Sequence, residues 1–447
     1  MATELKALEK SYQETFRAMH DSAPDTNVAW FDRLRRNAMA QFEELGFPSV
    51  KDEEWKYTNV APLALNVARM DFKAASPATQ VAERELTDLG IVEARESQLV
   101  FLNGSIRNDL SSLAALPSEV VVIDLMEAIV DARYSELAWK HLAQEADYVA
   151  DGFIALNTAM MSHGAFVYIP QGVEVDVPLH LLFISDGEQS TSFPRVLVIG
   201  EENSRATLLE SYISTREAQY FTNAAVEVVL KDGARLEHYK VQRESISAFH
   251  IATTAVDLGA GASYDATTIT FGAQLSRHDV NVRMDHEGAE CWVDGLYIVT
   301  TGQHADTHSL IDHRKPHCTS HQLYKGILDG KSRAVFNGKI FVRHDAQKTD
   351  AMQTNKNLLL SNEARVDTKP QLEILADDVK CAHGAAVGQI DEDELFYLAT
   401  RGIHPDLARN LLTYGFAEEV IGKIKIDSIR EQLDEAVLNR LNARLEV

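Results

Sequence analysis

Two side chains that could bind a metal together lie two residues apart in the segment KCAHGAAVG (380–388). On an extended strand, Cys381 and His383 point to the same face, and a thiolate beside an imidazole suits iron or zinc. Two ligands do not complete a metal site, so the others would have to come from elsewhere in the chain or from a partner. The alternative is structural, with Cys381 a small buried residue and His383 in a turn.

Five of the 16 histidines gather in the segment 304–321, namely His304, His308, His313, His317 and His321. The alternation in TGQHADTHSLID and the presence of Pro316 favour strand and turn over helix, which would place His304, Asp306 and His308 on one face. Imidazole and carboxylate suit zinc or iron, so one interpretation is a self-contained metalloprotein. The other is a set of hydrogen-bonded histidines stacked along the fold.

Several classes of function are disfavoured by motif and charge. The sequence has no GxxxxGK[ST], GxSxG or CxxC, which argues against a P-loop ATPase, a serine hydrolase and a self-contained iron–sulfur site. With 43 Lys and Arg against 67 Asp and Glu, the net charge of −24 argues against binding to nucleic acid or to an anionic membrane. Three cysteines and no secretion-like N-terminus predict a reduced, cytoplasmic protein.

The pattern of apolar residues divides the chain into three parts. Residues 1–160 read as a helical or mixed domain, residues 161–390 as short alternating strands, and residues 391–447 as helices again. Small-residue turns recur in the strand region at steps of roughly 30 residues, which is typical of a solenoid. The equivalent points are taken as Ser204, Ala234, Ala262, Ala289, Ser332 and Ala364.

Strand-only repeats favour a β-helix, and an antiparallel sandwich is the competing fold. The fold class expected is therefore mainly β: a parallel β-helix flanked by helical domains. A β-helix with a wide exposed groove could also act on polysaccharides, although few aromatic residues recur in register to bind sugar rings.

Several segments resemble the SufB/SufD family of iron–sulfur cluster assembly scaffolds. The most specific is CAHGAAVGQIDEDELFYLATRGI (381–403), preceded by VDTKPQLEILADDVK (366–380), and DEEWKYTNV (52–60) matches near the N-terminus. The D-type branch, SufD, is the better fit, because B-type chains usually carry a cysteine where Leu398 stands. The resemblance implies a right-handed parallel β-helix in a non-ATPase scaffold subunit, without its own catalytic residues.

The resemblance also implies partners and a site. SufB would contact the strands that precede Lys380, at the end of the β-helix. The ATPase SufC would contact the helices that begin at Asp391. The SufC side would include Phe396, Tyr397, Arg401, Gly402 and Ile403. His383 is the first candidate and Cys381 the second for holding iron or a nascent cluster at the SufB interface. The resemblance further implies iron acquisition and a flavin in the complex, and leaves a homodimer of the isolated chain open.

Overall fold

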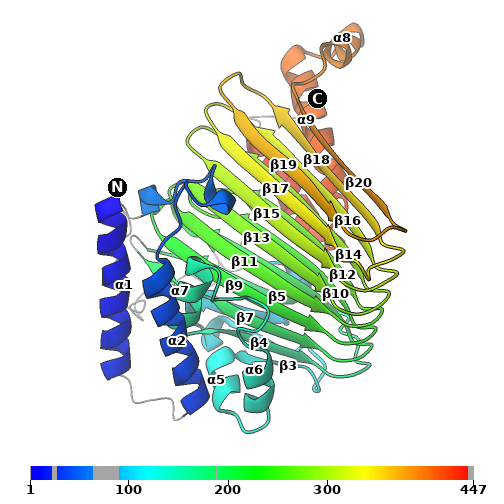
Figure 1. Ribbon diagram of the computed structural model, residues 1–447. Coiled ribbons are helices and arrows are strands. Elements are labelled where there is room, and N and C mark those ends of the chain that lie inside the picture. The colour runs from blue at the N-terminus through cyan, green and yellow to red at the C-terminus, as the bar shows by residue number, and fades with distance from the viewer. Residues whose placement is uncertain (1, 23–27, 64–89, 188–189, 441–447) are drawn as a thin grey trace.

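The computed structural model describes residues 2–22, 28–63, 90–187 and 190–440, and its centre is a stack of parallel strands. Figure 1 shows the N-terminal helices beside the stack and the start of the C-terminal helical segment projecting beyond its other end. From β7 onward, successive strands alternate between two sheets, so each pair of strands forms one coil of a parallel β-solenoid. This confirms the predicted β-helix and excludes the antiparallel sandwich.

Sheet A and sheet B form the two walls of the solenoid. Sheet A runs in the order β2 (Ser105–Ile106), β1 (Gln98–Leu102), β5 (Leu179–Ser185), β8 (Arg205–Ser214), β10 (Arg235–Arg243), β12 (Ser263–Phe271), β14 (Glu290–Val299), β16 (Thr319–Leu328), β18 (Asp350–Leu359) and β20 (Lys380–Gly388). Sheet B runs β19 (Arg365–Ile374), β17 (Arg333–Val342), β15 (His304–His313), β13 (Leu275–Met284), β11 (Phe249–Leu258), β9 (Phe221–Leu230), β7 (Arg195–Gly200), β4 (Gly164–Ile169) and β3 (Val121–Asp124), with β6 (Thr191–Ser192) beside β9.

The helices lie before and after these strands in the sequence. They are α1 (Ala2–Ser22), α2 (Ala29–Leu45), α5 (Leu125–Val130), α6 (Ser135–His141), α7 (Gly152–Met160), α8 (Glu392–Thr400), α9 (Pro405–Ile421) and α10 (Asp427–Arg440), with single 3-10 turns η1 (Glu53–Trp55), η2 (Val92–Ala94) and η3 (Asn108–Leu110). None of the described helices has a stretch both long and apolar enough to cross a membrane.

The tight corners that precede the sheet A strands repeat from coil to coil. Ser204, Ala234, Ala262 and Ala289 occupy equivalent corners, as predicted, and the three alanines are fully buried. The strand register shows that Cys318 and Thr349 fill the next two corners, so the equivalence predicted for Ser332 and Ala364 is wrong. Those two residues precede sheet B strands instead. The repeat was misread because a thiol or a hydroxyl replaces the alanine methyl group.

The N-terminal helices pack on one end of the solenoid wall. Leu8, Tyr12 and Phe16 of α1 recur at four-residue steps in the sequence, and all three are buried. In α2 the same kind of spacing runs through Ala38, Phe42 and Leu45, of which the first two are buried and Leu45 is exposed. The helix also buries Phe31 against α5 and α6, while Ala38, Met39 and Phe42 pack with α1 and α7.

The two ends of the stack are built differently. At the N-terminal end, β2 and β3 each add an antiparallel strand to the first coils. At the C-terminal end, β19 and β20 are the last strands of their sheets, and most of their residues are exposed or half-buried. The outer face of sheet A is covered by α9 and α10, whose Val420, Ile429 and Leu433 pack on it.

Two glycines in left-handed turns offer a matched test of the coil geometry. Gly272 has φ +100, and a methyl group there would lie 2.1 Å from the carbonyl oxygen of Glu244. Gly261 has φ +60 and open space around it. We expect Gly261→Ala to cost only the left-handed backbone strain, about 1 kcal/mol. Gly272→Ala must also displace backbone, so its thermal unfolding midpoint should fall several degrees further. Equal midpoints would contradict this close approach.

Candidate functional site

Cys381 and His383 lie on β20, the last strand of sheet A. In register they follow Ala351 and Gln353 of β18, which are both buried and face the solenoid interior. The two side chains therefore share the inward face, as the sequence predicts, at the mouth of the solenoid, where no further coil of the described residues covers them. His383 is exposed and Cys381 is half-buried.

Cys381 packs at the edge of an apolar cluster rather than in a polar pocket. The cluster includes Ile340, Val342 and Ala376. Burial, with Asp350 nearby, raises the pKa of the Cys381 thiol, so in this chain the group is a neutral thiol at neutral pH. A metal or a positively charged partner would have to favour the thiolate before Cys381 could act as a ligand.

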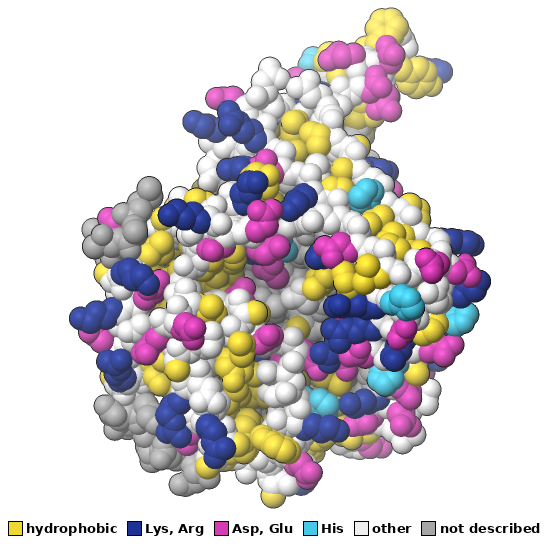
Figure 2. Space-filling view, viewed as in Figure 1, with side chains coloured by type: hydrophobic (Ala, Val, Ile, Leu, Met, Phe, Trp, Pro, Cys, Tyr) yellow, Lys and Arg dark blue, Asp and Glu magenta, His cyan; other side chains and the backbone are white. Residues whose placement is uncertain are grey.

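The residues predicted to face the ATPase lie apart from this pair. Phe396 and Tyr397 are 69% and 57% exposed on α8, where Arg401 lies over the Tyr397 ring at 5.2 Å and donates to its hydroxyl at 3.2 Å. Gly402 has φ +82 and ends the helix before Ile403. Figure 1 shows α8 projecting from the body of the molecule, and Figure 2 shows acidic and apolar side chains gathered on that projection.

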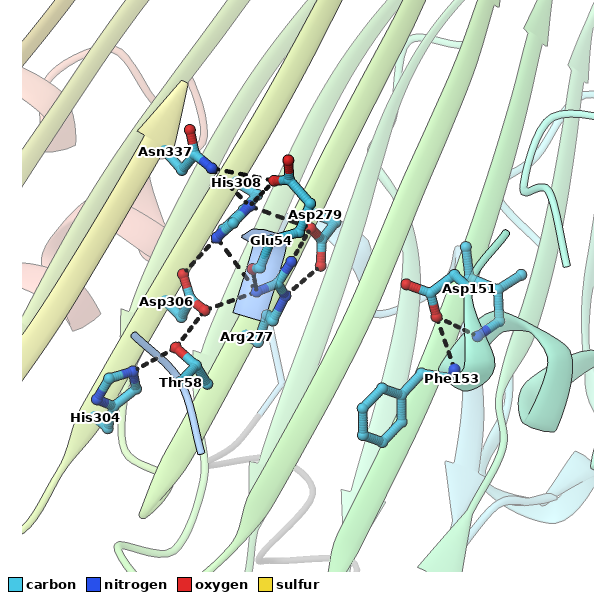
Figure 3. Close-up of polar contacts among 11 residues, drawn as sticks. Glu54, Thr58, Asp151, Phe153, Arg277, Asp279, His304, Asp306, His308 and Asn337 are labelled. Carbon is cyan, nitrogen blue, oxygen red and sulfur yellow. Dashed lines mark hydrogen bonds and ion pairs between the residues drawn. The ribbon is translucent and has the colours of Figure 1, made fainter. Parts of the chain in front are cut away.

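The predicted grouping of His304, Asp306 and His308 is confirmed. All three point outward from β15 and meet the segment 52–60 (Figure 3). Thr58 donates to Asp306 at 2.5 Å and contacts His304 Nε2 at 2.9 Å. These histidines thus anchor a strap, defined here as residues 52–60, which connects the N-terminal helices to the solenoid.

Arg277 of β13 is the centre of this cluster, although no sequence motif indicated it. Its guanidinium donates to Asp279 at 2.8 Å, to Asp306 at 2.9 Å and to the carbonyl oxygen of Glu54 at 2.7 Å. The same group lies 3.8 Å from the centroid of the Trp55 ring. Because Arg277 is 2% exposed, its charge is balanced by these neighbours rather than by water.

The contacts of the strap extend over four consecutive strands of sheet B. Arg277 lies on β13 and Asp306 on β15, while Asn337 of β17 donates to Glu54 at 3.1 Å and Lys369 of β19 pairs with Glu53 at 2.9 Å. The strap therefore reaches the terminal coil.

The remaining histidines of the segment 304–321 lie in separate parts of the structure. His313 is buried inside the solenoid, 2.8 Å from the Ser320 hydroxyl. His317 lies at a turn with φ +60, and His321 stacks on Trp292 outside sheet A. No three His, Cys, Asp or Glu side chains among the described residues are arranged to hold a metal ion. The geometry therefore gives no support to a self-contained metalloprotein.

A hollow of about 550 Å³ lies beside the strap on the outer face of sheet B, and Figure 2 shows this face hollowed at its centre. Its lining includes five carboxylates against Arg277, Lys339 and His308. The only aromatic residue in that lining, Trp55, is 5% exposed and is covered by Arg277 and Phe153. The hollow therefore fits neither the anionic phosphate and flat ring of a flavin nor the sugar platforms of a polysaccharide enzyme.

The strap cluster predicts a specific pH dependence. Burial disfavours the charged imidazole, but the Asp306 carboxylate and hydrogen bonds to Asp306 and Glu54 raise the pKa of His308 from 6.5 to about 9. The charged imidazole therefore contributes to the free energy of unfolding. This contribution is fully present below pH 6.5 and is lost as the pH rises through about 9. We expect a contribution of up to about 3 kcal/mol.

Thermal unfolding measured across that pH window should therefore show a decline in the wild-type chain that His308→Gln abolishes. His317→Gln, at an exposed turn, is the matched control and should keep the decline. An identical pH profile for wild type and His308→Gln would contradict the assignment.

Comparison with known proteins covers nearly the whole chain. Residues 6–181 match the family model of the SufBD protein N-terminal region, and residues 183–416 match the model described as SUF system FeS cluster assembly, SufBD core domain. An iron–sulfur cluster assembly SufBD family protein of Synechocystis is 38% identical over 90% of this chain and 89% of its own length. The iron–sulfur cluster assembly protein SufD of Escherichia coli is 31% identical over 91% of both chains, and that of Bacillus subtilis 27% over 96% of both.

With a solenoid core and both family regions matched in order, this chain belongs to the SufBD family of SUF-system iron–sulfur cluster assembly proteins.

Proposed function

We propose that this chain is a non-catalytic scaffold subunit of a SufB–SufC–SufD complex, in which it takes the SufD role and supports iron acquisition. The open end of its solenoid forms half of a site for iron or a nascent cluster, with His383 as the first ligand and Cys381 as the second, and SufB supplies the rest. The observation that carries the proposal is the terminal coil, where both side chains face a mouth that no strand of the described residues covers.

The terminal coil has the properties of a docking surface. The outer edges of β19 and β20 have no neighbouring strand within the described residues, so their backbone groups are available to a partner's strands. Apolar side chains gather at the same end, with Leu375 57%, Val387 46% and Ile374 39% exposed. A partner solenoid that continued both sheets would bury these groups and close the mouth over His383.

The C-terminal helices offer a separate surface for the ATPase. The exposed pair Phe396 and Tyr397 on α8 resembles the aromatic anchors that dominate protein interfaces. Helix α9 connects this surface to the solenoid, because Lys325 of β16 pairs with Glu419 and donates to the carbonyl oxygen of Phe416 at 2.8 Å. Movement of α8 and α9 would therefore reach the sheet that carries His383.

A reducing compartment, such as the cytoplasm, suits this function. Cys291, Cys318 and Cys381 are all free thiols. A thiol at an assembly site must stay reduced to bind iron or sulfide.

Replacement of His383 tests the ligand assignment. In the reconstituted complex with SufB and SufC, we expect His383→Ala to lower the rate of cluster assembly at least about tenfold, because the ligand set loses a donor. The readout is the absorbance of the cluster formed, with gel filtration to confirm that the complex is intact.

His344→Ala is the matched control, since its side chain is 82% exposed on another turn, and it should assemble clusters normally. Cys381→Ala is expected to have a smaller effect than His383→Ala, because its thiol is neutral in the isolated chain. A normal rate for His383→Ala would show that the site is placed wrongly.

The aromatic pair on α8 tests the second surface. We expect the double replacement Phe396→Ala with Tyr397→Ala to weaken SufC binding at least about tenfold, measured by calorimetry. Trp139→Ala on α6 is the control, because Trp139 is similarly exposed, at 58%, on a different part of the molecule. Equal affinities for the double variant and the wild type would exclude α8 from the interface.

A further inference from the structure

One inward-facing position of sheet A changes character toward the open end of the solenoid. In successive coils it is occupied by Ala266, Val293, Gln322, Gln353 and His383. The first two residues pack as ordinary apolar core. The next two place carboxamides in a buried wall, with Gln322 3% and Gln353 1% exposed. Because Val293 fills the same position one coil earlier, packing alone does not require an amide here.

The two amides are joined, yet each keeps one polar atom unpaired. Gln353 donates from Nε2 to Oε1 of Gln322 at 2.5 Å. Gln353 Oε1 and Gln322 Nε2 find no hydrogen-bond partner among the described residues. A buried carbonyl oxygen without a donor is unfavourable, so an arrangement that keeps one calls for a group that binds it.

The opposite wall of the solenoid is shaped to hold the Gln353 amide. Gly338 of β17 lies across the interior, and a methyl group there would come within 2.4 Å of Gln353 Nε2. The amide is therefore held on the side of sheet B by a close approach and on the side of the previous coil by Gln322. The side that remains is that of the next coil, where His383 is its direct neighbour in register.

We propose that Gln353 is the positioning residue for His383: its free Oε1 accepts a hydrogen bond from one ring N–H of the imidazole and leaves the other nitrogen free to bind iron. Parallel neighbours lie about 4.8 Å apart, which lets in-register side chains stack and bond. A ligand histidine is commonly fixed in this way by an acceptor on its second nitrogen. The inference rests on the function proposed above, because it assumes that His383 is a ligand.

The test measures the tautomer of His383 directly in the full-length chain. Long-range proton–nitrogen NMR of histidine-labelled protein, at a pH where the imidazole is neutral, gives the protonation of each ring nitrogen, and the His383→Ala spectrum assigns the signals. We expect one dominant tautomer in the wild type. We expect Gln353→Leu to shift His383 to the mixture shown by the exposed His344, and Gln353→Glu, which keeps an acceptor oxygen, to restore the single tautomer.

Unchanged signals of the buried His313 in each variant serve as the control that the interior is intact. Identical His383 tautomers in wild type and Gln353→Leu would overturn the inference. In the assembled complex, Gln353→Leu should also slow cluster assembly about tenfold. If His383→Ala assembled clusters normally while the tautomer still followed Gln353, the proposed function would fail and the hydrogen bond would stand.

Discussion

A strand in a parallel stack needs a hydrogen-bonded neighbour on both sides, and the last coil of any solenoid lacks one. This chain meets the need at only one end. Antiparallel β2 and β3 complete the first coils, whereas β19 and β20 end the stack with their outer edges uncovered in the described structure. The position of the inward-facing histidine, the exposed apolar residues and the expected partner all follow from that asymmetry.

The fold could be predicted from the sequence to a large extent, because alternation of apolar residues and turns at regular steps are local signals. The face shared by Cys381 and His383 followed from strand geometry alone. The repeat was misread where Cys318 and Thr349 take the place of alanine. These corners select a side chain for its small volume, so a thiol or a hydroxyl can fill them as well as a methyl group. The exposed Leu45 shows a similar limit of sequence patterns. Helix α2 packs against two groups of neighbours and buries two faces, so a single apolar stripe does not describe it.

The candidate site was harder to predict beyond its two named residues. Arg277 and Asp306 lie one coil apart and are direct neighbours in register, but Trp55 lies outside the repeat, so no spacing rule connects it with them. Gln353 is an ordinary amide until the strand register places it beside His383. The histidine-rich segment illustrates the same point, because its side chains point in different directions. Some anchor the strap, one is buried inside the solenoid, and others lie on the outer surface.

The strap connects the N-terminal helices with the terminal coil, and this connection affects how the terminal coil could bind a partner. It runs from the N-terminal helices across sheet B to Lys369 on the terminal coil. The exposed pair that Lys369 forms with Glu53 contributes little alone, but Trp55 and Thr58 anchor the same segment on buried groups. The entropy cost of ordering this edge thus falls on folding rather than on complex formation. A partner that docked on this end would meet an edge that the N-terminal segment has already ordered.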